Sequence, residues 1–134
     1  MAASSDDNFD WVGAQAGCSV VEMFQKLQDG ARADVERRNG VARADDWRFE
    51  IHVHDDGFEV VRIGGSSKDG AVVTFEREGP RINIAGDGVD VRITAVVGIN
   101  PSGECRYFVG ELEYLGWEVR KHALDQLFFE DVEE

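Results

Sequence analysis

The sequence predicts an α+β domain in which an N-terminal amphipathic helix and a C-terminal helix flank a curved antiparallel meander of six or seven strands. Apolar residues recur with the 3.6-residue period of a helix near both ends of the chain. Between Trp47 and Leu115 the period changes to two, which is typical of strands. In that segment, clusters of Gly, Asp, Asn and Pro recur every roughly eight to twelve residues, as tight turns between antiparallel strands require.

Residues 1–18 are small and acidic with no sustained period, so we expect a flexible N-terminal arm followed by a single domain over residues 19–134. Ser19 and Glu22 have the spacing of a capping box, in which each side chain satisfies a backbone N–H at a helix start. A helix is therefore predicted over residues 20–38, ending at an Asn-Gly pair. Its apolar stripe consists of Val20, Met23, Phe24, Leu27, Ala31 and Val35.

The strands that follow alternate apolar and polar residues, so one face of the sheet should be buried. Their connections are short enough that each strand should pair with the strand before it, which gives a meander. A sheet of this length curls under its own twist and can hold a helix in its concave side. The strands are predicted at residues 47–54, 58–64, 71–77, 81–85, 89–98, 104–109 and 112–115.

A second helix is predicted over residues 117–130 because apolar residues there share one broad side. The apolar arc covers about half of the helix, which is more than packing on one sheet requires. Either this helix is deeply buried in the monomer, or it uses the excess to contact a partner. The residues of the arc are Trp117, Val119, Ala123, Leu124, Leu127 and Phe128. The candidate interface consists of Trp117, Leu124, Phe128 and Phe129.

The composition is that of one globular domain, with 134 residues of which 43% are hydrophobic and 31% charged. A net charge of −13 disfavours nucleic acid as a partner, since nucleic-acid-binding proteins neutralise phosphates with clustered Lys and Arg. No apolar run approaches the roughly 20 residues of a membrane helix, so no membrane partner is expected.

The two cysteines, Cys18 and Cys105, lack the Cys-x-x-Cys spacing of redox and zinc motifs. The N-terminal residues do not show the pattern of a signal peptide, so a cytoplasmic location is expected. Cys18 precedes the first helix and is interpreted as a small buried residue, while Cys105 alternates with apolar residues and is assigned to the core.

Two of the three histidines lie in the segment FEIHVHDD, residues 49–56. In a strand, Glu50, His52 and His54 point to the face opposite the apolar residues, with the histidines about 6.6 Å apart. Two imidazoles at this separation can share a metal ion, or exchange protons beside carboxylates. The alternative is the solvated face of an ordinary strand. Two ligands do not complete a zinc site, so no metal and no cofactor are predicted.

Asp34 and Arg38 fall inside the apolar stripe of the first helix at i, i+4 spacing. A carboxylate held against an apolar sheet can have a raised pKa and act as a base in a cavity. The alternative is a partly exposed ion pair at the end of a helix. The candidate pocket consists of Asp34, Arg38, Glu50, His52 and His54.

These observations favour a non-enzymatic, acidic, cytoplasmic binding module that contacts another protein, or its own copy in a homodimer, through the sheet and the C-terminal helix. No catalytic residue is predicted. The alternative is a small-molecule-binding protein or enzyme with a pocket between the N-terminal helix and the curved sheet, in which case a small-molecule ligand is expected.

Overall fold

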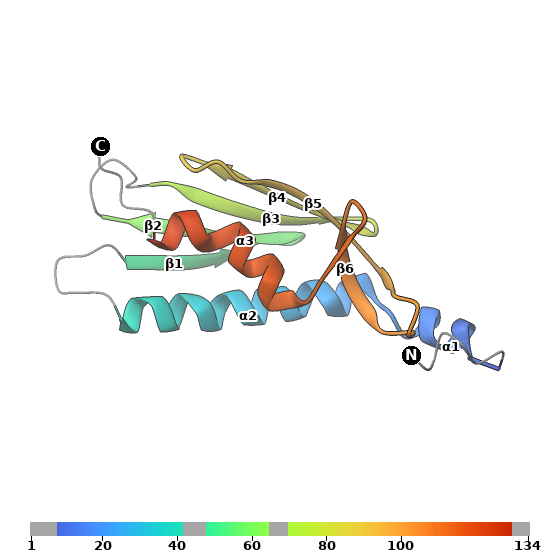
Figure 1. Ribbon diagram of the computed structural model, residues 1–134. Coiled ribbons are helices and arrows are strands. Elements are labelled where there is room, and N and C mark those ends of the chain that lie inside the picture. The colour runs from blue at the N-terminus through green and yellow to red at the C-terminus, as the bar shows by residue number, and fades with distance from the viewer. Residues whose placement is uncertain (1–7, 42–47, 65–69, 130–134) are drawn as a thin grey trace.

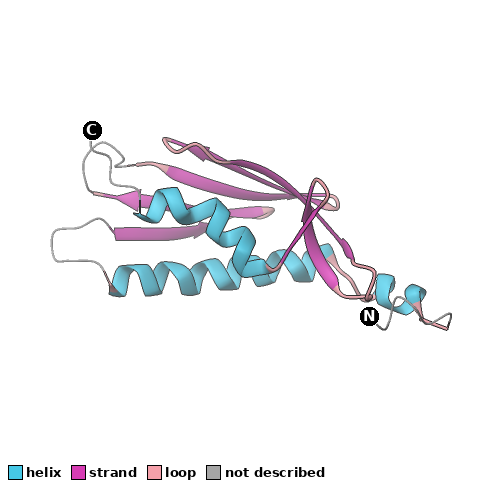
Figure 2. Cartoon of the chain, in the orientation of Figure 1, coloured by secondary structure: helices cyan, strands magenta, loops and turns pink. Residues whose placement is uncertain are grey.

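The computed structural model describes residues 8–41, 48–64 and 70–129, and it confirms the predicted α+β class (Figures 1 and 2). The helices are α1 (Trp11–Ala16), α2 (Val20–Gly40) and α3 (Gly116–Phe129). The strands are β1 (Arg48–Val53), β2 (Gly57–Ile63), β3 (Val72–Glu78), β4 (Arg81–Asp87), β5 (Arg92–Ile99), β6 (Cys105–Val109) and β7 (Leu112–Tyr114). Residues 1–7 of the predicted arm, Trp47 and Glu130 lie outside the described residues.

The seven strands form one sheet in the order β1 to β7, and each is antiparallel to its neighbour, as the short connections predict. Two of the predicted turns depend on glycines in the left-handed region, Gly79 in the β3–β4 hairpin and Gly110 in the β6–β7 hairpin, both with φ of 62°. The sheet twists strongly between β1 and β6 (Figure 1).

Helix α2 begins where the sequence predicts, because the hydroxyl oxygen of Ser19 accepts a hydrogen bond from the backbone N–H of Glu22 at 3.2 Å. It continues two residues beyond the predicted end, to Gly40. The predicted apolar stripe faces the sheet: Val20 packs partly buried against the core, and the rest of the stripe is buried. The buried members are Met23, Phe24, Leu27, Ala31 and Val35.

The hydrophobic core lies between one face of the sheet and the two long helices, which run side by side across that face (Figure 1). At its centre the Phe58 ring lies between two others, with centroids 5.5 Å from Phe24 of α2 and 4.5 Å from Phe75 of β3. Helix α3 contributes the residues that its period predicts, Val119, Ala123, Leu124, Leu127 and Phe128. Within the described chain, no helix combines the length and apolar character that crossing a membrane requires.

The segment before α2 contains a short helix that the periodicity does not predict. Helix α1 is capped by Asp10, whose carboxylate accepts a hydrogen bond from the N–H of Gly13 at 2.9 Å. The chain then reaches Cys18, which forms a disulfide with Cys105 at the start of β6. The sequence interpretation of Cys18 as a small buried residue and of Cys105 as a core residue was therefore wrong: both are half-buried and bonded to each other. Their bond joins the beginning of α2 to the far half of the sheet.

We expect loss of this disulfide to lower the free energy of unfolding by about 2–4 kcal/mol, because a cross-link across a long loop restricts the unfolded chain. Guanidinium unfolding of oxidised wild type and of Cys18→Ser/Cys105→Ser measures the difference. Dithiothreitol supplies the control, since reduced wild type should unfold at the same guanidinium concentration as the variant. A wild-type curve that dithiothreitol does not shift would contradict the pairing.

Candidate functional site

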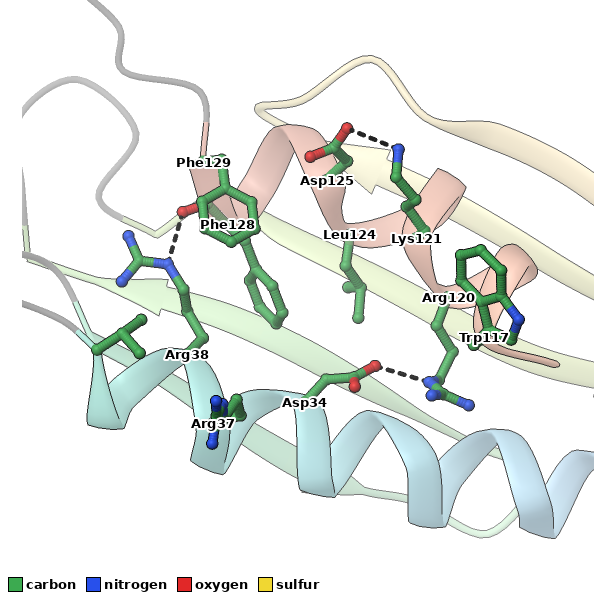
Figure 3. Close-up of a pocket in the computed structure, with 11 residues that line it drawn as sticks. Asp34, Arg37, Arg38, Trp117, Arg120, Lys121, Leu124, Asp125, Phe128 and Phe129 are labelled. Carbon is green, nitrogen blue, oxygen red and sulfur yellow. Dashed lines mark hydrogen bonds and ion pairs between the residues drawn. The ribbon is translucent and has the colours of Figure 1, made fainter.

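An apolar hollow with charged edges lies between α2 and α3, and we call it the α2–α3 groove (Figure 3). Its volume is about 450 Å³. Helix α2 and its C-terminal cap supply Asp34, Arg37, Arg38 and Val41. Helix α3 supplies Trp117, Arg120, Lys121, Leu124, Asp125, Phe128 and Phe129. All four predicted interface residues and two of the five predicted pocket residues therefore meet in one groove.

The floor and the ends of the groove differ in exposure. Leu124 and Phe128 point toward the core and form a buried floor. Trp117 and Phe129, by contrast, are 55% and 62% exposed at opposite ends of α3, and Val41 is exposed at the end of α2. Large apolar side chains that stay this exposed beside a hollow are typical of a contact surface.

An ion pair crosses the groove. Asp34 of α2 accepts a hydrogen bond from the Nε of Arg120 of α3 at 2.6 Å, and both side chains are partly buried. Gly30, one turn before Asp34, lies against this crossing, and a side chain there would require the Arg120 guanidinium to shift.

Arg38, the i, i+4 neighbour of Asp34, also contacts α3. Its Nε donates to the carbonyl oxygen of Phe128 at 2.9 Å, and its guanidinium lies 5.4 Å and 5.1 Å from the ring centroids of Phe49 and Phe129. Arg62 of β2, which is fully buried, donates to the Leu127 carbonyl at 3.5 Å. Two cations thus contact the C-terminal end of α3, where a helix carries unsatisfied carbonyls and partial negative charge.

A second hollow of about 360 Å³ adjoins the groove and shares Trp117 and Arg120 with it. Its other lining residues are Met23, Lys26, Cys105, Arg106, Tyr107, Leu115 and Gly116. Burial raises the pKa of Tyr107 to about 12, so its hydroxyl stays protonated and donates to the Met23 carbonyl at 2.6 Å. That bond ties β6 to α2 and gives Tyr107 a structural role.

The remaining predicted pocket residues lie elsewhere, on the sheet face that carries no core. His52 contacts Glu50 (Nε2 to Oε1, 3.1 Å) and Glu59 of β2 (Nδ1 to Oε2, 3.5 Å), while His54 contacts Glu59 at 3.6 Å. Both imidazoles are about half exposed, at 48% and 50%. No group of three or more metal-ligating side chains is found in the parts of the chain that the structure describes.

The residues that line the groove are aromatic, aliphatic, basic or acidic, and its two carboxylates are those of Asp34 and Asp125.

Five lining residues of the groove were not predicted from the sequence: Arg37, Val41, Arg120, Lys121 and Asp125. On α3, a stripe of residues at intervals of four is exposed to solvent: Trp117, Lys121, Asp125 and Phe129. The Nζ of Lys121 lies 3.6 Å from the Oδ2 of Asp125. The interval of four is visible in the sequence as an i, i+4 series with aromatic residues at both ends. Arg37 and Arg120 carried no comparable signal, because their positions depend on how two helices distant in sequence pack together.

Comparisons of the chain with protein-family models, with curated proteins and with solved structures find no match. The function is therefore inferred from the geometry of the groove.

We expect the Asp34–Arg120 pair to have a coupling free energy of about 1 kcal/mol, since both partners are partly shielded from water. Urea unfolding of wild type, Asp34→Asn, Arg120→Gln and the double variant completes the cycle. The exposed Lys121–Asp125 pair is the matched control and should give a coupling near zero. Equal coupling in the two cycles would show that the crossing ion pair has no special role.

We expect the pKa of His52 to lie above its ordinary value of about 6.5, chiefly because Glu50 hydrogen-bonds to the imidazole, with Glu59 adding to the effect. The contribution of protonated His52 to the free energy of unfolding is therefore fully present below about pH 6.5, the ordinary pKa. It is lost as the pH rises through the raised pKa. NMR titration should give a lower His52 pKa in Glu50→Gln. Glu111→Gln, at the opposite edge of the sheet, should not change it. Identical titrations in wild type and Glu50→Gln would rule out the contact.

Proposed function

We propose that the chain is a non-enzymatic binding module that holds a segment of another polypeptide in the α2–α3 groove. The observation that carries the proposal is the groove itself, an apolar hollow of about 450 Å³ with Trp117 and Phe129 exposed at its ends. Pockets that bind small ligands have volumes of roughly 300–1,000 Å³, and the groove lies within this range. Trp and Arg, both present here, are enriched among the residues that dominate binding energy at protein interfaces.

The partner is another protein or a second copy of the chain, and the two differ in a measurable way. A homodimer that uses the groove has a molar mass that falls to the monomer value on dilution, and Trp117→Ala should move that transition to higher concentration. A heterologous partner leaves the chain monomeric by light scattering at all concentrations. The cellular compartment is also part of the proposal. The sequence favours the cytoplasm. A disulfide such as Cys18–Cys105, by contrast, is typical of oxidising compartments.

The small-molecule alternative is supported by the second hollow, which α2, β6 and α3 line together. It is smaller than the groove and has fewer aromatic side chains at its edge. We favour the polypeptide because large exposed apolar side chains flank the groove on both helices, and a small ligand does not require them.

We expect a random peptide library displayed on phage to yield peptides that bind wild type with micromolar dissociation constants. Their affinity for Trp117→Ala/Phe129→Ala should be at least about tenfold lower, a loss of about 1.4 kcal/mol in binding free energy. Both side chains are exposed, so the variant should keep its far-ultraviolet circular dichroism. The control, Val96→Ala/Leu112→Ala, removes exposed apolar side chains outside the groove and should bind as wild type does. Peptides that bind all three proteins equally would refute the proposal.

A further inference from the structure

The charge of the site is opposite to the charge of the chain. The chain has 14 basic and 27 acidic residues. The groove and the hollow that shares Trp117 and Arg120 with it are lined by two acidic residues, Asp34 and Asp125. Another hollow, which shares Lys121, Asp125 and Phe129 with the groove, adds Asp90. The basic residues that line the first two hollows are six: Lys26, Arg37, Arg38, Arg106, Arg120 and Lys121. Arg106 pairs with Glu104 and Glu113, which leaves the other five as the cations of the site. We call these two hollows together the seam.

Three of these cations are placed to meet a ligand. Lys26 and Arg37 are exposed on α2, and Lys121 is exposed on α3. Lys121 pairs with Asp125, but both side chains are more than half exposed, and pairs of this kind contribute little and can open. Charges farther away than a Debye length, about 8–10 Å near physiological ionic strength, are screened, so the basic and acidic residues that line the groove contribute most to the field inside it.

The shape of the seam indicates an elongated ligand. Trp117 and Arg120 line both hollows, so the two form one continuous surface between α2 and α3. Trp117 and Phe129 are separated by twelve residues of α3, which corresponds to about 18 Å along the helix axis. That length accommodates about three turns of a second helix. A fatty acid requires a more enclosed cavity, because such ligands bury roughly 70–90% of their surface.

We propose that the occupant of this seam is an acidic amphipathic helix of a partner protein. This inference rests on the proposed function and specifies its partner. The apolar face of the partner helix lies on the groove between Trp117 and Phe129, with anchors spaced one turn apart. Its carboxylates contact Lys26, Arg37 and Lys121. The net charge of the rest of the chain repels acidic segments from other surfaces, so binding is confined to the seam.

Three fluorescent 14-residue peptides test the inference. They share one apolar stripe and differ only at their polar positions, which are Glu in the first, Gln in the second and Lys in the third. Fluorescence anisotropy at about 0.1 M salt, where distant acidic residues are screened, should rank the affinities as Glu above Gln above Lys, with at least about tenfold between the extremes. The advantage of the Glu peptide should shrink as salt is added. Its circular dichroism should show helix formed on binding, since a free peptide of this length is mostly unfolded.

Charge-reversal variants locate the effect. Arg37→Glu/Lys121→Glu should weaken the Glu peptide about tenfold and strengthen the Lys peptide. Arg81→Glu/Arg92→Glu changes the net charge equally at exposed positions on the sheet, outside both hollows, and should leave the ranking unchanged. Equal binding of the three peptides, or equal effects of the two variants, would overturn the acidic helix while leaving the proposed groove function intact. Failure of the displayed library to find groove-dependent peptides would instead remove the proposed function.

Discussion

The position of α3 depends on two buried arginines that come from other parts of the fold. Arg38 of α2 and Arg62 of β2 donate to the carbonyls of Phe128 and Leu127, at the end of α3. Taking a guanidinium out of water costs several kcal/mol unless hydrogen bonds and charge compensate it. Both arginines obtain part of that compensation from carbonyl oxygens of α3. A shift of this helix would therefore remove hydrogen-bond acceptors from two buried guanidinium groups. The helix, in turn, has its last carbonyls satisfied only where it lies beside α2 and above β2.

The groove follows from that placement. Once α3 lies against α2 with Leu124 and Phe128 facing the core, the residues that directly follow them, Asp125 and Phe129, lie on the exposed side of the helix. The stripe from Trp117 to Phe129 therefore faces outward, and the hollow forms where the two helices diverge above their buried contacts (Figure 3). The surface that we propose for binding is thus a direct result of how the second helix packs.

Local signals made most of the fold predictable. The helix cap at Ser19, the strand alternation and the glycines in the turns each act over a few residues, and they placed α2, the seven strands and α3 close to their observed bounds. The capping residue Asp10 was the available signal for α1, but six residues carry too little periodicity to predict a helix. The face of β1 that carries His52 and His54 was also predictable, because it depends only on the two-residue period.

The site required contacts that no local pattern reveals. Asp34 and Arg38 have the spacing of a helical ion pair, yet each contacts α3, because Arg120 and the Phe128 carbonyl reach them from residues 86 and 90 positions away in the chain. The pairing of Cys18 with Cys105, 87 positions apart, is of the same kind. The residues predicted to form one pocket therefore lie at two places: Asp34 and Arg38 line the groove, whereas Glu50, His52 and His54 lie on the opposite face of the sheet. The residues of the candidate interface on α3 form one wall of the groove.

The disulfide also divides the walls of the groove between two covalent units. A closed ring runs from Cys18 through α2 and the first five strands to Cys105, whereas α3 lies in the open tail beyond it. The α2 wall of the groove therefore belongs to a cross-linked ring. The α3 wall lies outside that ring and is held by its packing on the core and by the hydrogen bonds from Arg38 and Arg62.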